Sequence, residues 1–486
     1  MYNSYSERGE AVKDFITKYG ERIVHSYVYI IVVALLPFIG WWIKSLAFAY
    51  YSLSAMLIIT LILSKDFKAL IIFVPFGMTC FREFFYFHNI PKELLSITIC
   101  LIITIVGMIV KNIIANHKVK IQYGLIGRTV ILIGIITFLA GVVRHIFYNE
   151  PAFIEYTESY NVLYGYLGGL AFIFFGILCL LVKTFSSNDY QDTYEKTFYI
   201  FAIYLIAQCF IVLVNNDMDI SKIYHKLGKD YIGWCDKNTL SIAIQVTLPF
   251  LAYRYSKNYL RFDNLLLMGI GILLVLMSDS RGGQISVALL TFALIFVIIK
   301  PSKHYLIKFG ILIIASVISF FILYNNIPRL KESIDRLIEL GSNVTGRDVF
   351  WKWIIEYTYT ESKHVLFGGS TSYLFELYAK FNNTTKVIGI WLCHNTFMTA
   401  LAMGGTLGLI AVILHYGEAI IGAFKCTGDK NWMILSLIFF GLVHGMIDNT
   451  FFNPMYTIPH IFILSSYNKD FIFLPKWNRK KISDIA

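Results

Sequence analysis

The stretch SDSRGGQISVALLTFALIFVII at residues 278–299 decides the fold, because a polar motif passes directly into an unbroken apolar run. A run of this kind is expected to cross a membrane as a helix. Farther along, a polar segment of about 70 residues spans 325–394, and connections this long are usually functional. It ends at His394-Asn395, where the next apolar run begins.

The composition is that of a polytopic membrane protein. Of 486 residues, 57% are hydrophobic and 15% are charged, well below the roughly 25% charged residues of soluble domains. The mean hydropathy is +0.63. We therefore predict an all-α protein with about 14 transmembrane helices and one large, partly helical periplasmic loop. The predicted spans are 27–44, 46–63, 68–81, 94–110, 124–143, 161–182, 197–214, 238–253, 264–279, 284–299, 309–324, 396–424, 431–447 and 455–468.

The distribution of Lys and Arg predicts how these spans are oriented. With the N-terminus inside, one assignment places all the basic connections and the basic C-terminal tail in the cytoplasm. The expected parts are eleven spans in 1–324, a periplasmic loop in 325–394, and C-terminal spans with a cytoplasmic tail in 395–486. The polar first 26 residues predict no cleavable signal peptide.

Charge and motifs exclude several function classes. The net charge is +11, but the basic residues are scattered between spans and form no stripe for nucleic acid. The motifs HExxH, GxGxxG and the Walker loop are absent, and no metal-ligand cluster is apparent. We therefore expect neither a metal nor a cofactor.

The outside segment is expected to form a helical cap over a cavity between spans. Leu330, Ile334, Leu337 and Ile338 are spaced as one face of a helix, which Gly341 is expected to end. An aromatic helix is predicted at 348–359 and a third helix at 372–381. Aromatic residues of this kind suit an element that rests at the membrane interface.

Arg281 is the first candidate site residue, because an ionisable group at a span end usually faces a cavity or a partner. Ser280 and Gly282 beside it add a hydroxyl and a flexible backbone that can approach an anion. The alternative is an arginine that extends to the membrane surface or pairs with Asp279.

Arg347 and His394 are the other candidates, and Asn395 joins them as a candidate substrate-binding residue. Arginine suits a diphosphate because its planar fork donates two hydrogen bonds and stays charged. Histidine is the usual general base near neutral pH. The alternatives for Arg347 are a solvated loop arginine or a pair with Asp348 at a helix N-terminus. The alternative for His394 is a buried, hydrogen-bonded histidine at an interface. His364, His444 and Asp448 rank lower because no surrounding pattern supports them.

The order of these motifs resembles the O-antigen polymerase (Wzy) and O-antigen ligase superfamily. The resemblance rests on Ser-Arg-Gly-Gly at 280–283, Thr-Gly-Arg at 345–347, and His-Asn-x9-Gly-x2-Gly at 394–408. It covers about 277–410, whereas the N-terminal half matches only in being polytopic. One departure is Ile285, where ligases often have Leu.

The resemblance implies a metal-independent, GT-C-like glycosyltransferase of the bacterial inner membrane whose active site faces the periplasm. Its donor would be an undecaprenyl diphosphate-linked glycan. Arg281 and Arg347 would stabilise the diphosphate, and His394 would act as base or orient the acceptor. The implied partners are a glycan acceptor, a chain-length regulator and a flippase.

Three functions fit these residues. Chain length and the Gly-Gly of the first motif favour a polymerase that joins repeat units over a ligase that transfers the glycan to lipid A-core. A lipid-linked oligosaccharide flippase is the alternative from another class, although no internal repeat is apparent.

Overall fold

The computed structural model describes residues 16, 18–80, 92–115, 124–147, 163–186, 192–215, 237–278, 280–300, 302–339, 347–360, 362–370, 393–426 and 430–467. Within these ranges every regular element is a helix, which confirms the all-α prediction. The helices are α2 (Tyr27–Trp42), α3 (Leu46–Leu63), η1 (Phe67–Ile72), α4 (Phe73–Cys80), α5 (Lys92–Ala115), α6 (Leu125–Val142), η3 (Val143–Phe147), α7 (Leu163–Phe185), α8 (Thr193–Val214), α10 (Lys237–Lys257), α11 (Phe262–Leu276), α12 (Arg281–Ile299), α13 (Tyr305–Asn326), α14 (Pro328–Glu339), α15 (Arg347–Thr360), α16 (Ser362–Val365), α18 (Thr396–Phe424), α19 (Lys430–Gly445), η5 (Thr450–Phe452) and α20 (Pro454–Tyr467).

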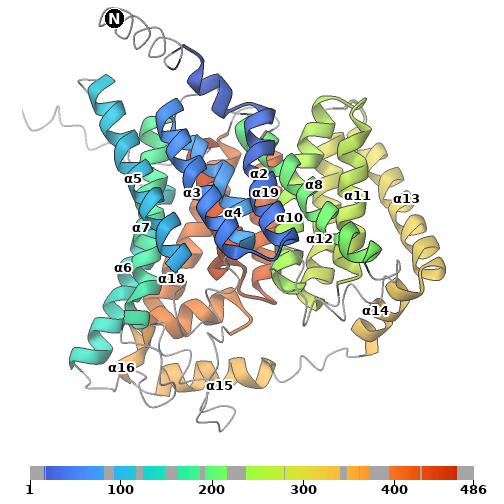
Figure 1. Ribbon diagram of the computed structural model, residues 1–486. Coiled ribbons are helices and arrows are strands. Elements are labelled where there is room, and N and C mark those ends of the chain that lie inside the picture. The colour runs from blue at the N-terminus through green and yellow to red at the C-terminus, as the bar shows by residue number, and fades with distance from the viewer. Residues whose placement is uncertain are drawn as a thin grey trace, which may run out of the picture.

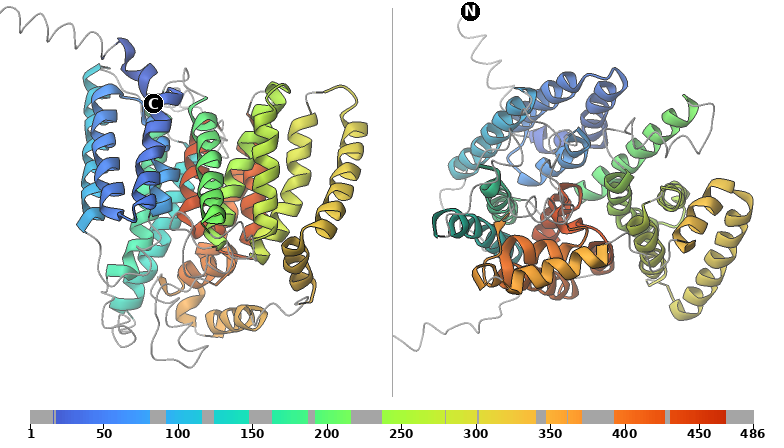
Figure 2. Two further views of the ribbon diagram at one scale, coloured as in Figure 1. Left: turned by 45° about the vertical axis from the view of Figure 1, so that its right-hand side comes forward. Right: turned by 90° about the horizontal axis from the view of Figure 1, so that it is seen from below.

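The apolar helices form a membrane-spanning bundle (Figure 1). Eight described helices are long and apolar enough to cross a membrane, and a ninth counts if 18–24 and 27–42, bent by 52°, form one span. Each of the fourteen predicted runs coincides with helix, but the number of spans stays a prediction. The third run comprises the short helices η1 and α4, and the last run is the short helix α20, which lies near the centre of the bundle (Figure 2).

The helices of the predicted loop lie together at one end of the bundle, which we call the α15 end. Figure 1 shows α14, α15 and α16 at this end. The aromatic helix forms as predicted, over Arg347–Thr360. In α14, Leu330 and Ser333 are buried. Ile338 is 68% exposed, so its predicted place on the packed face of this helix was wrong. Gly341 and the predicted helix 372–381 lie outside the described residues.

Helix α13 stands at the edge of the bundle and buries none of its residues (Figure 2). It spans 22 residues with a mean hydropathy of 2.6. Such a surface would be unstable in water and is suited to contact with lipid tails.

The long run 396–424 is broken within the helix. Gly405 has φ 61° and ψ −156°, so α18 is two helical pieces joined at a kink. The turn at 366–369 inserts at the break, where Gly369 N–H donates to Ala402 O (3.0 Å) and Leu407 N–H donates to Leu366 O (3.2 Å). These bonds satisfy backbone groups that a kink leaves without helical partners.

We expect Gly405→Ala to lower the free energy of unfolding by about 1–3 kcal/mol, because only glycine adopts this backbone conformation without strain. A Cβ at this position would also stand 2.5 Å from Gly368 N. The thermal unfolding midpoint of the purified protein measures the effect. Gly417→Ala on the same helix is the matched control, since nothing lies within 4 Å of its added Cβ. Equal midpoints for both variants would contradict the role given to the kink.

Candidate functional site

The polar motif at 280–283 forms the start of α12 at the α15 end. Ser280 is the N-cap, and its hydroxyl oxygen accepts from Gly283 N–H at 3.3 Å. A serine at this position satisfies an amide that the first helical turn leaves unpaired. Gly283 packs against Ser241 of α10 too closely for a side chain. Arg281 is thereby the first residue of α12 and remains partly exposed.

The residues that precede α18 are joined to the loop that follows α19. Asn395 is the N-cap of α18, and its side-chain oxygen accepts from Phe397 N–H (2.9 Å) and Met398 N–H (3.1 Å). Its amide nitrogen donates to Met446 O at 2.8 Å. The side-chain oxygen of Asn449 in turn accepts from the backbone N–H of Asn395 at 3.0 Å. The two asparagines therefore fix the two loops relative to each other.

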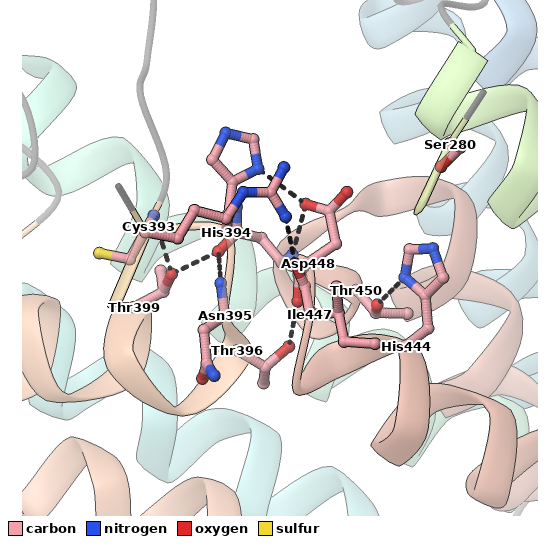
Figure 3. Close-up of polar contacts among 12 residues, drawn as sticks. Ser280, Cys393, His394, Asn395, Thr396, Thr399, His444, Ile447, Asp448 and Thr450 are labelled. Atoms are coloured by element: carbon pink, nitrogen blue, oxygen red, sulfur yellow. Dashed lines mark hydrogen bonds and ion pairs between the residues drawn. The ribbon is translucent and has the colours of Figure 1, made fainter. Parts of the chain in front are cut away.

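These contacts bring His394 to Asp448. His394 Nδ1 lies 3.3 Å from Asp448 Oδ1 (Figure 3). Because an ionised carboxylate only accepts, Nδ1 carries the proton and Nε2 is left as the basic nitrogen of the neutral ring. The side chain of His394 is 34% exposed, against 13% for Asp448. Its backbone φ of 50° is uncommon outside glycine and is often found at functional positions.

Asp448 is ionised in the folded protein. Burial of the carboxyl opposes ionisation, but the hydrogen bond from His394, the charges of His444 and His394, and the N–H of Asn449 outweigh it. Together they lower the pKa of Asp448 to about 2. A buried anion therefore accepts from His394 and orients its ring.

We expect Asp448→Asn to destabilise the protein at neutral pH by about 1–3 kcal/mol, because it removes a charge-assisted hydrogen bond from a buried site. The pKa in the folded state, about 2, lies below the roughly 3.9 of an unfolded aspartate. The stabilisation is thus complete above about pH 4 and is lost as the pH falls towards 2. Unfolding midpoints of wild type and variant across this range test it. A stability difference already lost at about pH 5 would contradict the assignment.

Helix α15 contacts both loops and places Arg347 at the same site. Arg347 donates from a terminal guanidinium nitrogen to Ile447 O at 2.8 Å. One turn later, Trp351 Nε1–H donates to Cys393 O at 2.7 Å. Burial lowers the pKa of Arg347, the charge of Asp448 raises it and the charge of Arg281 lowers it. An arginine remains protonated through such a shift, so two positive charges lie within interaction range of each other here.

The structure therefore gathers the predicted residues around the segment 444–450. A Cβ at Gly282 would lie 3.4 Å from Ile447 Cγ2, so the start of α12 adjoins this segment as well. Ser280 and Asn395 have capping roles, and direct contact of either with substrate stays a prediction. His364 Nδ1 lies 3.2 Å from Gly368 O, at the turn beside α16.

Asp448, which had no supporting pattern in the sequence, lies next to His394 in the structure. It lies 54 positions from His394, so their contact is invisible locally. One local signal was present: Asp448-Asn449-Thr450 follows an apolar run, just as His394-Asn395-Thr396 precedes one.

A group with metal-ligand chemistry occurs at the opposite end of the bundle and was not identified from the sequence. The ligand atoms of Glu21, His25 and Asp66 lie within 4.8 Å of one another. His25 Nε2 is 3.6 Å from Glu21 Oε2 and 3.8 Å from Asp66 Oδ2. The group lies beside the start of α2 and η1, at the end of the bundle opposite α15 (Figure 1), and is separate from the candidate site.

The fold and the site together define a polytopic all-α membrane protein with a histidine–carboxylate pair and two arginines at one end. Residues 266–413 match the model of the O-antigen ligase family, which confirms the resemblance over a stretch that includes Arg281, Arg347 and His394. The match supports a membrane glycosyltransferase-like function. No curated protein matches the chain, and no solved structure does.

Proposed function

We propose that this protein is a glycosyltransferase of the bacterial inner membrane that takes its sugar donor from undecaprenyl diphosphate. The observation that carries the proposal is the His394–Asp448 pair at 3.3 Å, beside Arg347 and within the range of the charge of Arg281. Glycan transfer from a lipid diphosphate to an acceptor hydroxyl needs a base for the hydroxyl proton and positive charge for the leaving diphosphate. The histidine and the two arginines can supply these.

In the proposed step, the acceptor hydroxyl attacks the anomeric carbon as its proton passes to His394 Nε2. The bond between that carbon and the phosphate oxygen breaks, and the lipid diphosphate leaves with the electron pair. Arg281 and Arg347 stabilise the negative charge that develops on the leaving group. Asp448 stabilises the imidazolium that forms.

The proposed placement is periplasmic, with both termini in the cytoplasm. Lys257 in the last turn of α10 and Lys300 at the C-cap of α12 fit this orientation, because basic residues gather on the cytoplasmic side. The proposed partners are a glycan acceptor, a chain-length regulator and a flippase, with no metal or cofactor.

We favour a polymerase that joins repeat units. A ligase that transfers the glycan to lipid A-core is the second candidate, which the description of the matching family favours. A flippase is less favoured, because a transporter usually carries its charged substrate site near the middle of the membrane. Here Arg347, His394 and Asp448 lie at the end of the bundle where α15 packs.

A strain lacking the gene tests the proposal, with envelope glycans separated on a gel and lipid-linked intermediates extracted in parallel. A core with a single repeat and no ladder identifies a polymerase. A bare core with long glycan on the polyprenyl lipid identifies a ligase. Plasmid-borne wild type should restore the ladder, and His394→Ala should not. If glycans and lipid pool are unchanged by the deletion, the proposal is wrong.

A further inference from the structure

His444 is a buried histidine of the last turn of α19 with only one ring nitrogen engaged. Its relative exposure is 0%, and Nδ1 lies 2.6 Å from Thr450 Oγ1. Among the residues that the structure describes, none offers a hydrogen-bond partner to Nε2. Leaving a buried polar nitrogen unpaired costs free energy, so a position of this kind calls for an explanation.

The unpaired nitrogen faces the first turn of α12. A Cβ built on Gly282 would lie 3.6 Å from His444 Nε2. In Figure 3, His444 lies on the side of the 444–450 segment towards Ser280, which caps α12. Glycine at 282 therefore leaves room beside the nitrogen that any side chain would take.

The same turn has the electrostatics of an anion site. Helix α12 has 19 residues, and its N-terminus carries the positive end of the helix dipole. Ser280 binds the N–H groups of Gly283 and Gln284. The first two amides of the helix, at Arg281 and Gly282, have no hydrogen-bond partner among the described residues. Arg281, the first residue of α12, adds a positively charged side chain to this turn.

The proton position on His444 depends on the direction of its hydrogen bond with Thr450. If the Thr450 hydroxyl donates to Nδ1, Nε2 carries the ring proton and becomes a donor directed at α12. Two backbone amides, Arg281 and an imidazole N–H then lie at the start of one helix, and phosphate oxygens accept from all of these groups.

We propose that His444 Nε2, with the first-turn amides of α12, binds a phosphate group of the lipid diphosphate. The inference rests on the proposed function. It adds His444 as a further residue that binds phosphate, and it explains why position 282 is a glycine. The competing explanation is that His444 only ties α19 to η5 through Thr450.

The test measures the affinity of the purified full-length protein in detergent for undecaprenyl diphosphate. His444→Gln places an amide near the position of Nε2, whereas His444→Asn places one near Nδ1. A lost hydrogen bond to a charged group corresponds to about a tenfold or greater loss of affinity. We expect that loss for His444→Asn and a loss of only about threefold for His444→Gln.

Gly282→Ala is a second variant for the same affinity measurement, in case a His444 variant fails to fold. Its Cβ would make ordinary contacts of 3.4–3.7 Å, so the protein should fold while the space beside Nε2 is filled. We expect an affinity about tenfold lower and an unfolding midpoint close to wild type.

The outcomes separate this inference from the proposed function. If wild type binds undecaprenyl diphosphate and both His444→Asn and Gly282→Ala bind it equally well, the phosphate role of His444 is overturned while the function stands. A His444→Asn variant that outperforms His444→Gln would support the purely structural role instead. If wild type itself does not bind undecaprenyl diphosphate, the proposed donor is wrong and the subsite falls with it.

Discussion

Replacing His394 with alanine is expected to reduce turnover by about 10²–10⁴-fold, the usual contribution of a positioned general base. The variant loses the basic Nε2 and leaves the buried carboxylate of Asp448 without its 3.3 Å partner. Transfer of labelled glycan from the undecaprenyl diphosphate donor, measured with purified protein, gives the rate.

The backbone at His394 requires a matched control, because an alanine at φ 50° is strained whatever the chemistry. His304 is exposed, lies at the start of α13 and has φ 59°. His304→Ala therefore imposes a similar backbone cost away from the site, and its turnover should stay within about twofold of wild type. If Asp448 acts through His394, adding Asp448→Asn to His394→Ala should cause little further loss. Full activity of His394→Ala in normally folded protein would remove His394 from the mechanism.

Arg347→Ala is expected to reduce turnover by about 10²–10³-fold, the effect of removing one group that stabilises a developing negative charge. The guanidinium is held at its place by the 2.8 Å bond to Ile447 O. Arg347→Lys should recover only part of the activity, because lysine keeps the charge but not the planar fork. The same transfer assay, with donor concentration varied, measures both variants.

Arg336→Ala is the matched control for arginine loss in the same segment. Arg336 forms a bond to Glu332 on the exposed side of α14, and its side chain is 44% exposed. An exposed ion pair contributes little, so activity should stay within about twofold of wild type. An Arg347→Ala variant that transfers glycan at the wild-type rate would show that leaving-group stabilisation lies elsewhere.

The helical character of the chain was predictable from apolar run length alone. In lipid, each backbone N–H and C=O must be satisfied within the protein, so a long apolar run becomes a helix. The same argument does not decide whether the short helices α4 and α20 span a membrane. Phe67–Ile72 before α4 is buried throughout, and α20 lies near the centre of the bundle. Apolarity does not distinguish a helix surrounded by protein from one surrounded by lipid.

The chemistry of the candidate site was also partly predictable. Arg281, Arg347 and His394 were selected because their side chains suit a diphosphate and a proton transfer, and because their motifs follow one another in order. The capping roles of Ser280 and Asn395 were also predictable from the sequence. Each stands directly before a helical run, where serine and asparagine satisfy free amides.

The sequence alone determined that this protein is a helical membrane protein with two arginines and a histidine in motifs of the O-antigen ligase type, because run length and side-chain chemistry are local properties. Only the tertiary structure decided that Asp448 pairs with His394, that α18 breaks at Gly405 where the turn at 366–369 inserts, and that His444 faces Gly282. These contacts depend on how α12, α18 and α19 pack against one another. Packing joins residues far apart in the chain, and no local pattern encodes it.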